Sequence, residues 1–531
     1  MTTSTKQLIF ALVWATLYTL VFIVFMPGPS RIDFLDLDTA WRTNSNGNVP
    51  SLGYWTELLI AYGWVFLLFL ICTYSYVLFF TLVPIIFLSS AVVAYTETTI
   101  GSAISRDLIA SVFQINMVEV SASTNKHIIT WIVASLVMLA LCFFHFLRLK
   151  LRHNWIEKTV IVIGFGLAFN FISTLSTYEK KYLYWRHPLD YMEYSVSFLK
   201  ENISINNLMN KTDLGLVAGN AYTPPAGSTG MPLTVAFVIG ESARPDHFGL
   251  YGYNRNTTPL LAKENNVIAF SDVKSCGTLT LVSVPCFMTR ETPKTLGLSR
   301  QEKSFVSIFK ALGFQTTWIS EQAEFSGINT IVASIAKEAD DVLFQENNLS
   351  HDVKKFQDLY LRGLRNKQNA NLQVFHMNGS HFPYQWMYPE EFRLFTPTCS
   401  SNKIQIQDCP HEALINSYDN TIVFTDYFLN RVIDSLRDQN AIMIFVSDHG
   451  EYLGEKGKYL HGQETDDAEV RQVPMIWWAS DLYKTYNPEK VQALLSHSHD
   501  TLSHDNIFHS VLDCANIRSS VIDLKLSLCQ K

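Results

Sequence analysis

Five apolar runs in the first third of the chain constrain its fold more than any other feature. A membrane-spanning helix takes about 20 apolar residues, and the runs approach or reach that length. No small-residue cleavage site follows the first run, so we interpret it as an anchor rather than a signal peptide. Residues 1–177 are therefore predicted to form a transmembrane domain of five helices, at roughly Leu8–Met26, Leu58–Thr73, Val77–Tyr95, Ile128–Leu147 and Val160–Leu175.

Basic residues orient these spans. The loop between the fourth and fifth runs carries Arg148, Lys150, Arg152 and Lys158, and positive charge marks loops on the cytoplasmic side. The N-terminus is then cytoplasmic and everything after the fifth run lies outside. In a Gram-negative cell this predicts a multi-pass protein of the inner membrane with a periplasmic domain. The net charge of −7 gives no basic surface for nucleic acid.

The cysteines agree with this orientation. Six of the eight lie in the second half of the chain and fall into three close pairs along the sequence. An even set of locally spaced cysteines predicts disulfides and an oxidising compartment; the alternative is a set of free thiols in a reducing one. The other two, Cys72 and Cys142, lie in apolar runs and are predicted to be buried thiols.

Two polar segments accompany the predicted spans. The stretch Thr96–His127 joins the third and fourth runs on the outer side and contains Gln114, Asn116 and Glu119. Polar groups at helical spacing near the interface suit a lipid head group, and a solvated interfacial helix explains them equally well. Residues 178–232 are predicted to be a bridging helix rich in aromatic residues, followed by a linker rich in Pro and Gly.

Residues 233–531 alternate buried runs with amphipathic ones, which predicts an α/β domain. Strand and helix in alternation indicate a mostly parallel sheet with helices on both faces. Ligands of such sheets bind at the carboxyl ends of the strands. The predicted strands are Thr234–Ile239, Phe314–Ile319, Leu372–His376, Ala441–Val446 and Met475–Trp478, and the clearest helical patterns are Phe305–Leu312 and Ala413–Arg437.

Ionisable side chains directly follow two of these strands. Glu241 comes after the first, and Asp448 with His449 comes after the strand near residues 441–446. Zinc accepts carboxylates and an imidazole while keeping a position open, and manganese is the alternative. Alone, Glu241 is explained as a helix cap and the Asp-His pair as a structural contact. Their convergence at one sheet edge is what predicts a metal site.

A nearly uncharged loop, SCGTLTLVSVPC at residues 275–286, supplies the predicted nucleophile. We expect the oxygen of Thr280 to take the open metal position, because a bound cation favours its alkoxide. The neighbouring hydroxyls of Thr278, Ser275 and Ser283 leave the choice open from the residue pattern alone.

Two loop histidines are further candidates. His381 follows the strand Leu372–His376, and His461 lies thirteen residues after Asp448. Such histidines bind a phosphate, donate a proton to a leaving group or hold a second metal; a surface position without function is the alternative. His376 is on the strand itself and is interpreted as a core residue.

Several motifs follow one another in a characteristic order: VIGESAR, GYNRNTTP, SCGTLTLVSVPC, NGSHFPY, LINSYDNTI, and SDHGEYLGE with LHG. In these motifs the chain resembles the phosphoethanolamine transferases of Gram-negative bacteria. The resemblance implies five transmembrane helices followed by a periplasmic α/β domain with the alkaline-phosphatase/sulfatase-like fold. It also implies transfer of phosphoethanolamine from phosphatidylethanolamine to lipopolysaccharide, on lipid A or an inner-core sugar, and we expect a monomer.

The same resemblance assigns site residues. Thr280, the second threonine of the SCGTxT motif, would attack the lipid phosphorus and release diacylglycerol. An acceptor oxygen would then attack the phosphoethanolamine-threonine intermediate. His381 and His461 match two histidines that bind the substrate phosphate and take part in catalysis. The implied metal ligands are Glu241, Thr280, Asp448 and His449, and the implied disulfides are Cys276–Cys286 and Cys399–Cys409. The Cys514/Cys529 pair resembles a cysteine pair of members that modify inner-core sugars.

Two departures from the family pattern leave the acceptor open. Members that modify lipid A often carry an Asn and a Lys after the strand ending at Trp318, where this chain has Gln322 in place of the Asn and no Lys. The family's ETNxxE pattern here reads QINMVE, so Asn116 and Glu119 carry over as substrate-binding residues and the threonine does not.

Three other functions fit the sequence less well. A sulfatase needs a Cys or Ser in a C/S-x-P-x-R motif, and the nucleophile position has no such motif. A glycerol-phosphate transferase uses a threonine and a metal but fits the motif set less well. A non-catalytic membrane scaffold should have lost at least one metal ligand, and all four are present.

Overall fold

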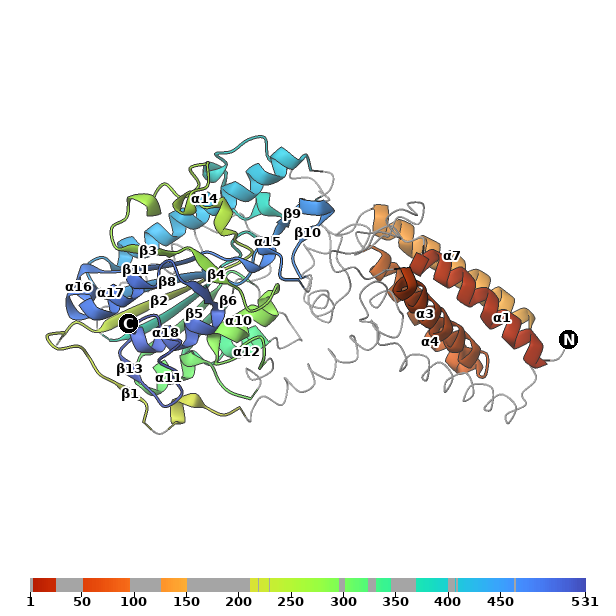
Figure 1. Cartoon of the computed structure of the whole chain (residues 1–531), viewed down its shortest axis with the longest axis horizontal. Coiled ribbons are helices and arrows are strands. Elements are labelled where there is room, and N and C mark those ends of the chain that lie inside the picture. The colour runs from red at the N-terminus through yellow and green to blue at the C-terminus, as the bar shows by residue number, and fades with distance from the viewer. Residues whose placement is uncertain are drawn as a thin grey trace. The chain divides into compact units, whose positions relative to one another are not determined.

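The computed structural model describes two compact units of the chain (Figure 1). The helices before residue 150 form the first, and the residues after 210 form most of the second. The described residues are 3–24, 51–95, 126–149, 211–217, 219–228, 230–295, 301–322, 331–344, 369–399, 406, 409–462 and 465–531.

The described part of the N-terminal unit consists of apolar helices. Helix α1 packs mainly against α3, and α4 packs mainly against α7. Large apolar side chains of α7, among them Val133, Val137 and Leu141, are exposed, which suits a surface that faces lipid. The helices are α1 (Thr3–Tyr18) with the π-helix η1 (Thr19–Val24), α3 (Ser51–Cys72), α4 (Tyr76–Tyr95) and α7 (Lys126–Arg148).

Three helices in the described residues are long and apolar enough to cross a membrane: Thr5–Ile23, Tyr76–Tyr95 and Ile128–Arg148. They coincide with the first, third and fourth predicted runs. The second run falls within α3, where Ala61–Cys72 is a shorter apolar stretch. The fifth run, Val160–Leu175, lies outside the described residues. An apolar helical unit is therefore present, and the predicted number of five spans stays a prediction.

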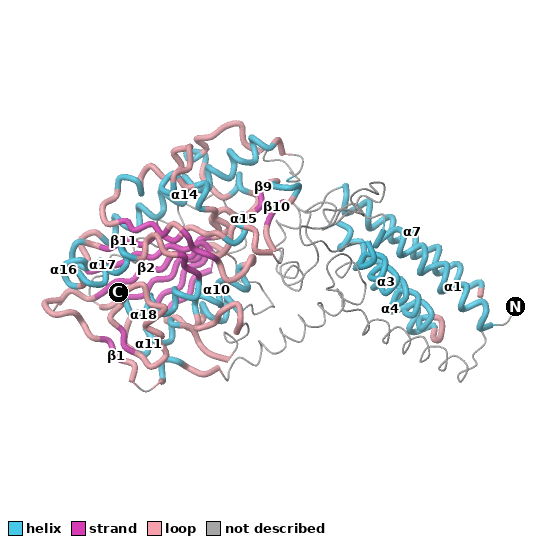
Figure 2. The backbone as a smooth tube through the Cα atoms, in the orientation of Figure 1, coloured by secondary structure: helices cyan, strands magenta, loops and turns pink. Residues whose placement is uncertain are grey.

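A seven-stranded sheet forms the centre of the second unit, drawn in magenta in Figure 2. Its strand order is β3-β11-β8-β2-β7-β5-β6. The strands from β8 to β6 in this order run parallel, whereas β11 is antiparallel to both of its neighbours. The strands are β2 (Leu233–Gly240), β3 (Val267–Phe270), β5 (Gln315–Ser320), β6 (Asp341–Phe344), β7 (Asn371–His376), β8 (Asn440–Ser447) and β11 (Met475–Ala479).

The prediction of a mostly parallel sheet is confirmed, and each predicted strand coincides with an observed one. The edge strands β3 and β6 were not predicted. They are only four residues long and partly exposed. An apolar run as short as the VIAF of β3 cannot be distinguished by its pattern from a buried turn of helix, and β6 begins with a charged residue. Because β11 is antiparallel, its carboxyl end lies at the opposite edge from the ends of β2, β5, β7 and β8.

Helices cover both faces of the sheet, as the cyan segments in Figure 2 show. Alternate residues of β2 enter two different cores: Phe237 packs in one with residues of α10, α11, α12 and α18, and Val238 packs in the other with residues of α14. The helices are α10 (Thr280–Met288), α11 (Phe305–Ala311), α12 (Ile331–Ala336), α14 (His411–Leu436), α15 (Ala468–Arg471), α16 (Asp481–Tyr486), α17 (Pro488–Ser496) and α18 (Ile507–Cys514).

Short strand pairs and disulfides complete the unit. Three disulfides join Cys276 to Cys286, Cys399 to Cys409 and Cys514 to Cys529. The two remaining cysteines, Cys72 and Cys142, lie in α3 and α7 of the other unit and are buried thiols, as predicted. The 3-10 helix η5 (Leu214–Leu216) contributes Leu214 to the core, so packing of this unit begins before residue 233. The pairs are β1 (Ala221–Tyr222) with β13 (Ile517–Arg518), β4 (Asp272–Lys274) with β12 (Thr501–Ser503), and β9 (Tyr452–Leu453) with β10 (Tyr459–Leu460).

Candidate metal centre and nucleophile

The register of β2 and β8 sets two carboxylates side by side. Gly240 at the end of β2 pairs with Ser447 at the end of β8, so Glu241 and Asp448 follow at neighbouring points of the same edge. A Cβ on Gly240 would lie 2.6 Å from the ring of Phe445, which explains why a glycine stands there. The backbone N–H of Ser242 donates to Asp448 Oδ1 at 3.2 Å and ties the two strand ends together.

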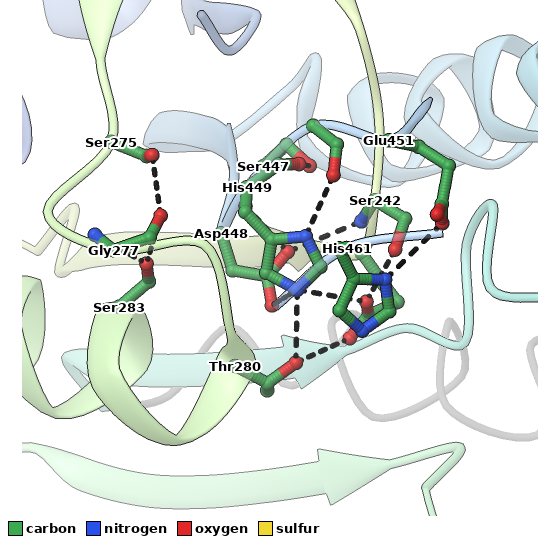
Figure 3. A network of polar contacts seen from close by, with 12 residues as sticks. Ser242, Ser275, Gly277, Thr280, Ser283, Ser447, Asp448, His449, Glu451 and His461 are labelled. Carbon is green, nitrogen blue, oxygen red and sulfur yellow. Dashed lines mark hydrogen bonds and ion pairs between the residues drawn. The ribbon is translucent and has the colours of Figure 1, made fainter. Parts of the chain in front are cut away.

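The disulfide loop brings Thr280 to this edge (Figure 3). Thr280 is the first residue of α10, so the positive end of the helix dipole faces its hydroxyl. The Thr280 Oγ1 donates to Glu241 Oε2 at 2.9 Å and lies 3.4 Å from His449 Nε2. Within the loop, the Ser275 and Ser283 hydroxyls both donate to the carbonyl of Gly277. Those two serines therefore stabilise the loop, and Thr280 is the hydroxyl aimed at the cluster.

The predicted ligands form a compact buried group. Ligand atoms of Glu241, Asp448 and His449 lie within 4.8 Å of one another, and all three residues are at most 1% exposed. The Oδ2 atom of Asp448 is buried and accepts no hydrogen bond from a described residue, although it lies 3.3 Å from His449 Nε2. Two carboxylates, an imidazole and an unsatisfied buried oxygen fit a divalent cation.

The tautomer of His449 supports the same interpretation. Its Nδ1 lies 2.9 Å from the carbonyl of Gly450, and an N–H donated there leaves the lone pair of Nε2 facing Glu241 and Asp448. Burial, and then the neighbouring His461, lower the pKa of His449 to about 4. The ring is therefore neutral at neutral pH, which is the form that binds a metal.

The surroundings shift the pKa values of Glu241 and Asp448 in opposite directions. Burial acts against the charge of Glu241, but neighbouring histidines lower its pKa to about 2. Burial and the charge of Glu241 raise the pKa of Asp448 well above its usual range. The ligand atoms of these two buried carboxylates lie within 4.8 Å of each other, so their negative charges repel. A divalent cation between them would relieve the repulsion.

The two loop histidines lie beside the same carboxylate. Ligand atoms of Glu241, His381 and His461 also lie within 4.8 Å of one another. The rings of His449 and His461 have centroids 4.2 Å apart, and those of His381 and His461 are 5.8 Å apart. The structure thus brings both histidines predicted from sequence to the metal centre. The third, His376, is buried on β7 at 2% exposure, as expected of a core residue.

Gln322 contacts the cluster directly. Its side-chain Nε2 donates to Glu241 Oε2 at 3.0 Å, the oxygen that also accepts from Thr280. Its substrate-binding role remains a prediction, while its contact with a candidate metal ligand is observed. The other predicted substrate residues, Asn116 and Glu119, lie outside the described residues, as does Gln114.

Two residues of the site were missed from sequence. Glu451 is fully buried and places its Oε2 3.3 Å from His461 Nδ1, and burial raises its pKa to about 8. Its position in the sequence could have identified it, because it follows Asp448 and His449 at the end of the same strand. His504 bridges the loop and β8: Cys276 N donates to its Nδ1 at 3.1 Å, and its Nε2 lies 3.1 Å from the carbonyl of Ser447. Nothing in the sequence near His504 pointed to that bridge.

The amino-acid sequence is similar to those of known proteins. A family model described as Sulfatase matches residues 234–517, more than half of the chain. The phosphoethanolamine transferase EptA of Escherichia coli strain K12 is 34% identical over 304 residues, which are 53% of each chain. The match thus spans about half the length of that relative.

Solved structures support the fold. An integral membrane lipooligosaccharide phosphoethanolamine transferase A from Neisseria meningitidis aligns over 98% of this chain and 97% of its own, with a TM-score of 0.78 at 23% identity. The periplasmic domain of EptC from Escherichia coli, solved in complex with Zn, covers 58% of this chain and 90% of its own, with a TM-score of 0.50 at 22% identity. An apolar helical region followed by a sulfatase-like domain is the architecture that this chain shares with the first of them.

Proposed function

This chain belongs to the Sulfatase family, and from that premise we propose that it is a metal-dependent transferase that moves phosphoethanolamine from phosphatidylethanolamine to lipopolysaccharide. One observation carries the proposal: Thr280 Oγ1 lies 2.9 Å from Glu241 Oε2 and 3.4 Å from His449 Nε2, at the N-terminus of α10. Relatives named as phosphoethanolamine transferases support the choice of the transferred group.

Four residues would hold the metal: Glu241, Asp448, His449 and Thr280. An imidazole among oxygen ligands favours zinc, with manganese as the alternative, and the zinc complex of the EptC domain supports this choice. When bound, the cation would favour the alkoxide of Thr280 and offset negative charge on the transferred phosphoryl group.

In the first step, Thr280 Oγ1 attacks the phosphorus of phosphatidylethanolamine. A bond from Oγ1 to phosphorus forms, the bond from phosphorus to the diacylglycerol oxygen breaks, and the product is phosphoethanolamine on Thr280. The hydroxyl proton is directed toward Glu241 Oε2, to which it is already donated. Thr280 is the first residue of α10, and the positive end of a helix dipole favours a phosphoryl group there.

His381 and His461 would act on the oxygens around the phosphorus. Their rings lie beside Glu241, within reach of a group attached to Thr280. One N–H can donate to a phosphoryl oxygen while a protonated ring gives its proton to the departing diacylglycerol oxygen. Glu451, beside His461 Nδ1, orients that ring.

In the second step, a hydroxyl or phosphate oxygen of lipopolysaccharide attacks the same phosphorus and restores the Thr280 hydroxyl. The acceptor is lipid A or an inner-core sugar. Gln322, Asn116 and Glu119 are proposed to contribute to substrate binding. We further propose that residues 1–177 span the inner membrane five times and that residues 178–232 connect this domain to the periplasmic domain, residues 233–531. The transfer would take place in the periplasm and would be carried out by a monomer.

A sulfatase reaction is the alternative that the family name raises, and a glycerol-phosphate transfer is a second. The nucleophile position holds a threonine without a C/S-x-P-x-R motif, which counts against the first. Hydrolysis of an aryl sulfate by the full-length protein, at a rate above its transfer of phosphoethanolamine, would overturn this choice.

Trapping the intermediate tests the proposal. Full-length protein in detergent is incubated with phosphatidylethanolamine without acceptor, digested and analysed by mass spectrometry. We expect one phosphoethanolamine on the peptide containing Thr280, also in a Thr278→Ala control. An adduct on any other residue, or none, contradicts the mechanism. Mass spectrometry of lipopolysaccharide from cells with and without the protein then assigns the added group to the lipid A or the core fragment.

A further inference from the structure

Ser242, the residue directly after Glu241, has an uncommon backbone conformation. Its φ angle is 56°, in the left-handed region that costs free energy for a residue other than glycine. Its side chain is fully buried. Backbone strain of this kind persists only where the surrounding structure enforces it, and it gathers at functional sites. The contacts of Ser242 show what enforces the conformation here.

Ser242 donates to both carboxylates of the candidate metal centre. Its hydroxyl donates to Glu241 Oε1 at 2.7 Å, and its backbone N–H donates to Asp448 Oδ1 at 3.2 Å (Figure 3). Asp448 Oδ1 also accepts from the backbone N–H of His449 at 2.8 Å. The second oxygen of each carboxylate faces the centre: Glu241 Oε2 accepts from Thr280, and Asp448 Oδ2 lies 3.3 Å from His449 Nε2. One residue thus helps to set the rotation of two candidate ligands.

Helix α14 holds the carbonyl side of the same turn. Tyr418 is fully buried, and its hydroxyl donates to the carbonyl of Ser242 at 2.6 Å. One turn later on the same helix face, the hydroxyl of Thr421 lies 2.6 Å from that of Ser380. Ser380 N in turn donates to the carbonyl of Glu241 at 2.9 Å. Helix α14 therefore restrains the backbone at both Glu241 and Ser242.

The residue type at position 242 is not explained by the turn alone. A glycine would adopt the left-handed conformation at no steric cost. It would also lose the hydroxyl that donates to Glu241 Oε1. A serine that keeps a strained backbone and places its hydroxyl on a buried carboxylate is therefore better explained by the carboxylate than by the turn.

We propose that Ser242 is a positioning residue of the metal centre, held in its left-handed conformation by Tyr418, and that it orients the two carboxylates before a divalent cation binds. Ligands that are already oriented lose less conformational freedom on binding, and hydrogen bonds to ligating carboxylates tune metal affinity. The inference rests on the proposed metal ligands Glu241, Asp448 and His449, and its test measures zinc binding rather than transfer.

Zinc affinity tests the proposal. Full-length protein in detergent is freed of metal and titrated with Zn²⁺ in competition with a chromogenic chelator. Glu241→Gln removes the charge of a ligand and identifies the part of the binding that belongs to the metal centre. We expect Ser242→Ala to weaken that binding about ten- to a hundredfold, because loss of a hydrogen bond to a ligating group costs that much affinity.

Two matched controls separate positioning from stability. Tyr418→Phe should weaken zinc binding at least about threefold, since it releases the carbonyl of Ser242. Tyr483 is also fully buried and donates to the carbonyl of Cys514 at 2.6 Å, so Tyr483→Phe should lower the unfolding temperature similarly without changing zinc affinity.

The second control matches the serine. Ser304 is fully buried and its hydroxyl donates to Glu338 Oε2 at 2.7 Å, the same kind of contact as that of Ser242 with Glu241. Ser304→Ala should therefore destabilise the fold and leave zinc affinity unchanged. The unfolding temperature of the metal-free protein measures the stability of each variant.

Ser242→Gly separates the hydroxyl from the backbone. Glycine relieves the left-handed strain, so this variant should be at least as stable without zinc as Ser242→Ala. It should nevertheless bind zinc about as weakly as Ser242→Ala, because both lack the hydroxyl. A merely structural role would change stability and affinity together.

Several outcomes would overturn the positioning role while the metal ligands stand. These are zinc binding by Ser242→Ala at wild-type affinity or tighter, equal weakening by Tyr418→Phe and Tyr483→Phe, and equal weakening by Ser242→Ala and Ser304→Ala. If the wild type binds no zinc, or if Glu241→Gln binds it equally tightly, the ligand set itself is wrong and the proposed function fails with it.

Discussion

Two disulfide loops of the same length have different consequences in this molecule. Cys276–Cys286 and Cys399–Cys409 each close over a separation of ten residues. The first contains Thr280 and is joined to two distant segments, through His504 and through the Arg471 guanidinium, which donates to the Cys276 carbonyl. The second precedes α14 and is joined to it where Cys399 N donates to Ser417 Oγ at 2.9 Å.

The difference shows that a disulfide by itself does not mark a site. Both loops gain from the reduced chain entropy of the unfolded state. Among the contacts of the described residues, the first loop is attached to the carboxyl edge of the sheet, where the buried carboxylates lie, and the second is attached to α14. The attachment, rather than the covalent closure, places a reactive hydroxyl beside Glu241.

The largest expected effect comes from the nucleophile in the first loop. Thr280→Ala should lower transfer by at least about a thousandfold, because loss of an attacking group removes the covalent route. Thr278→Ala should stay within about tenfold of the wild type, since catalysis is assigned to the other hydroxyl. Transfer from a labelled lipid donor measures both, and a larger loss in Thr278→Ala would exchange their roles.

Opening the first loop should have the next largest effect. The double variant Cys276→Ser, Cys286→Ser should lose about 2–4 kcal/mol of stability and about ten- to a hundredfold in transfer, because a misplaced reacting atom costs on the order of a hundredfold. Transfer is measured at a temperature at which thermal unfolding shows the variant to be folded. Wild-type transfer by the folded variant would show that the bridge does not position Thr280.

His504 tests the attachment of that loop without breaking its disulfide. His504→Ala should lower transfer about tenfold, since it removes the hydrogen bonds of the imidazole to Cys276 and to Ser447 and leaves the loop less fixed. His504→Gln, with one donor and one acceptor, should recover part of the loss. An unchanged rate in the alanine variant would mean that the loop is held by other contacts.

The same histidine gives a pH dependence. Burial lowers the pKa of His504 from 6.5 to about 3, so between those values the unfolded chain binds a proton that the folded chain does not. Its contribution to stability is therefore present above pH 6.5 and is lost as the pH falls toward 3. Between pH 7.5 and pH 5, the unfolding temperature should fall further in the wild type than in His504→Gln. Parallel curves would contradict this.

The smallest effect on transfer is expected from the second loop. Cys399→Ser, Cys409→Ser should cost about the same stability as the first pair, about 2–4 kcal/mol. The transfer rate of this variant should stay within about threefold of the wild type at a temperature where it is folded. The second loop does not carry Thr280, so opening it should barely move the reacting oxygen. Equal loss of transfer in both double variants would end the distinction between the loops.

The strands and site residues that could be predicted from the sequence are those marked by a local pattern. The continuous apolar run of β2 and the acid after it placed Glu241 at a sheet edge, and the same logic placed Asp448 and His449. The edge strands β3 and β6 are each only four residues long, too short for a distinctive pattern, and were missed. The choice of Thr280 over Thr278 rested on family resemblance, and the hydrogen bond to Glu241 now supports it on geometric grounds.

The sequence by itself determined the apolar helices, the parallel strands and the ligand types at their ends, because each depends on neighbours a few positions away. Only the tertiary structure decided that Gln322 donates to Glu241, that His504 joins Cys276 to Ser447, and that Tyr418 donates to Ser242. These contacts join segments separated by as many as 228 positions. No periodicity or spacing encodes such contacts, since they arise from the packing of the whole sheet and its helices.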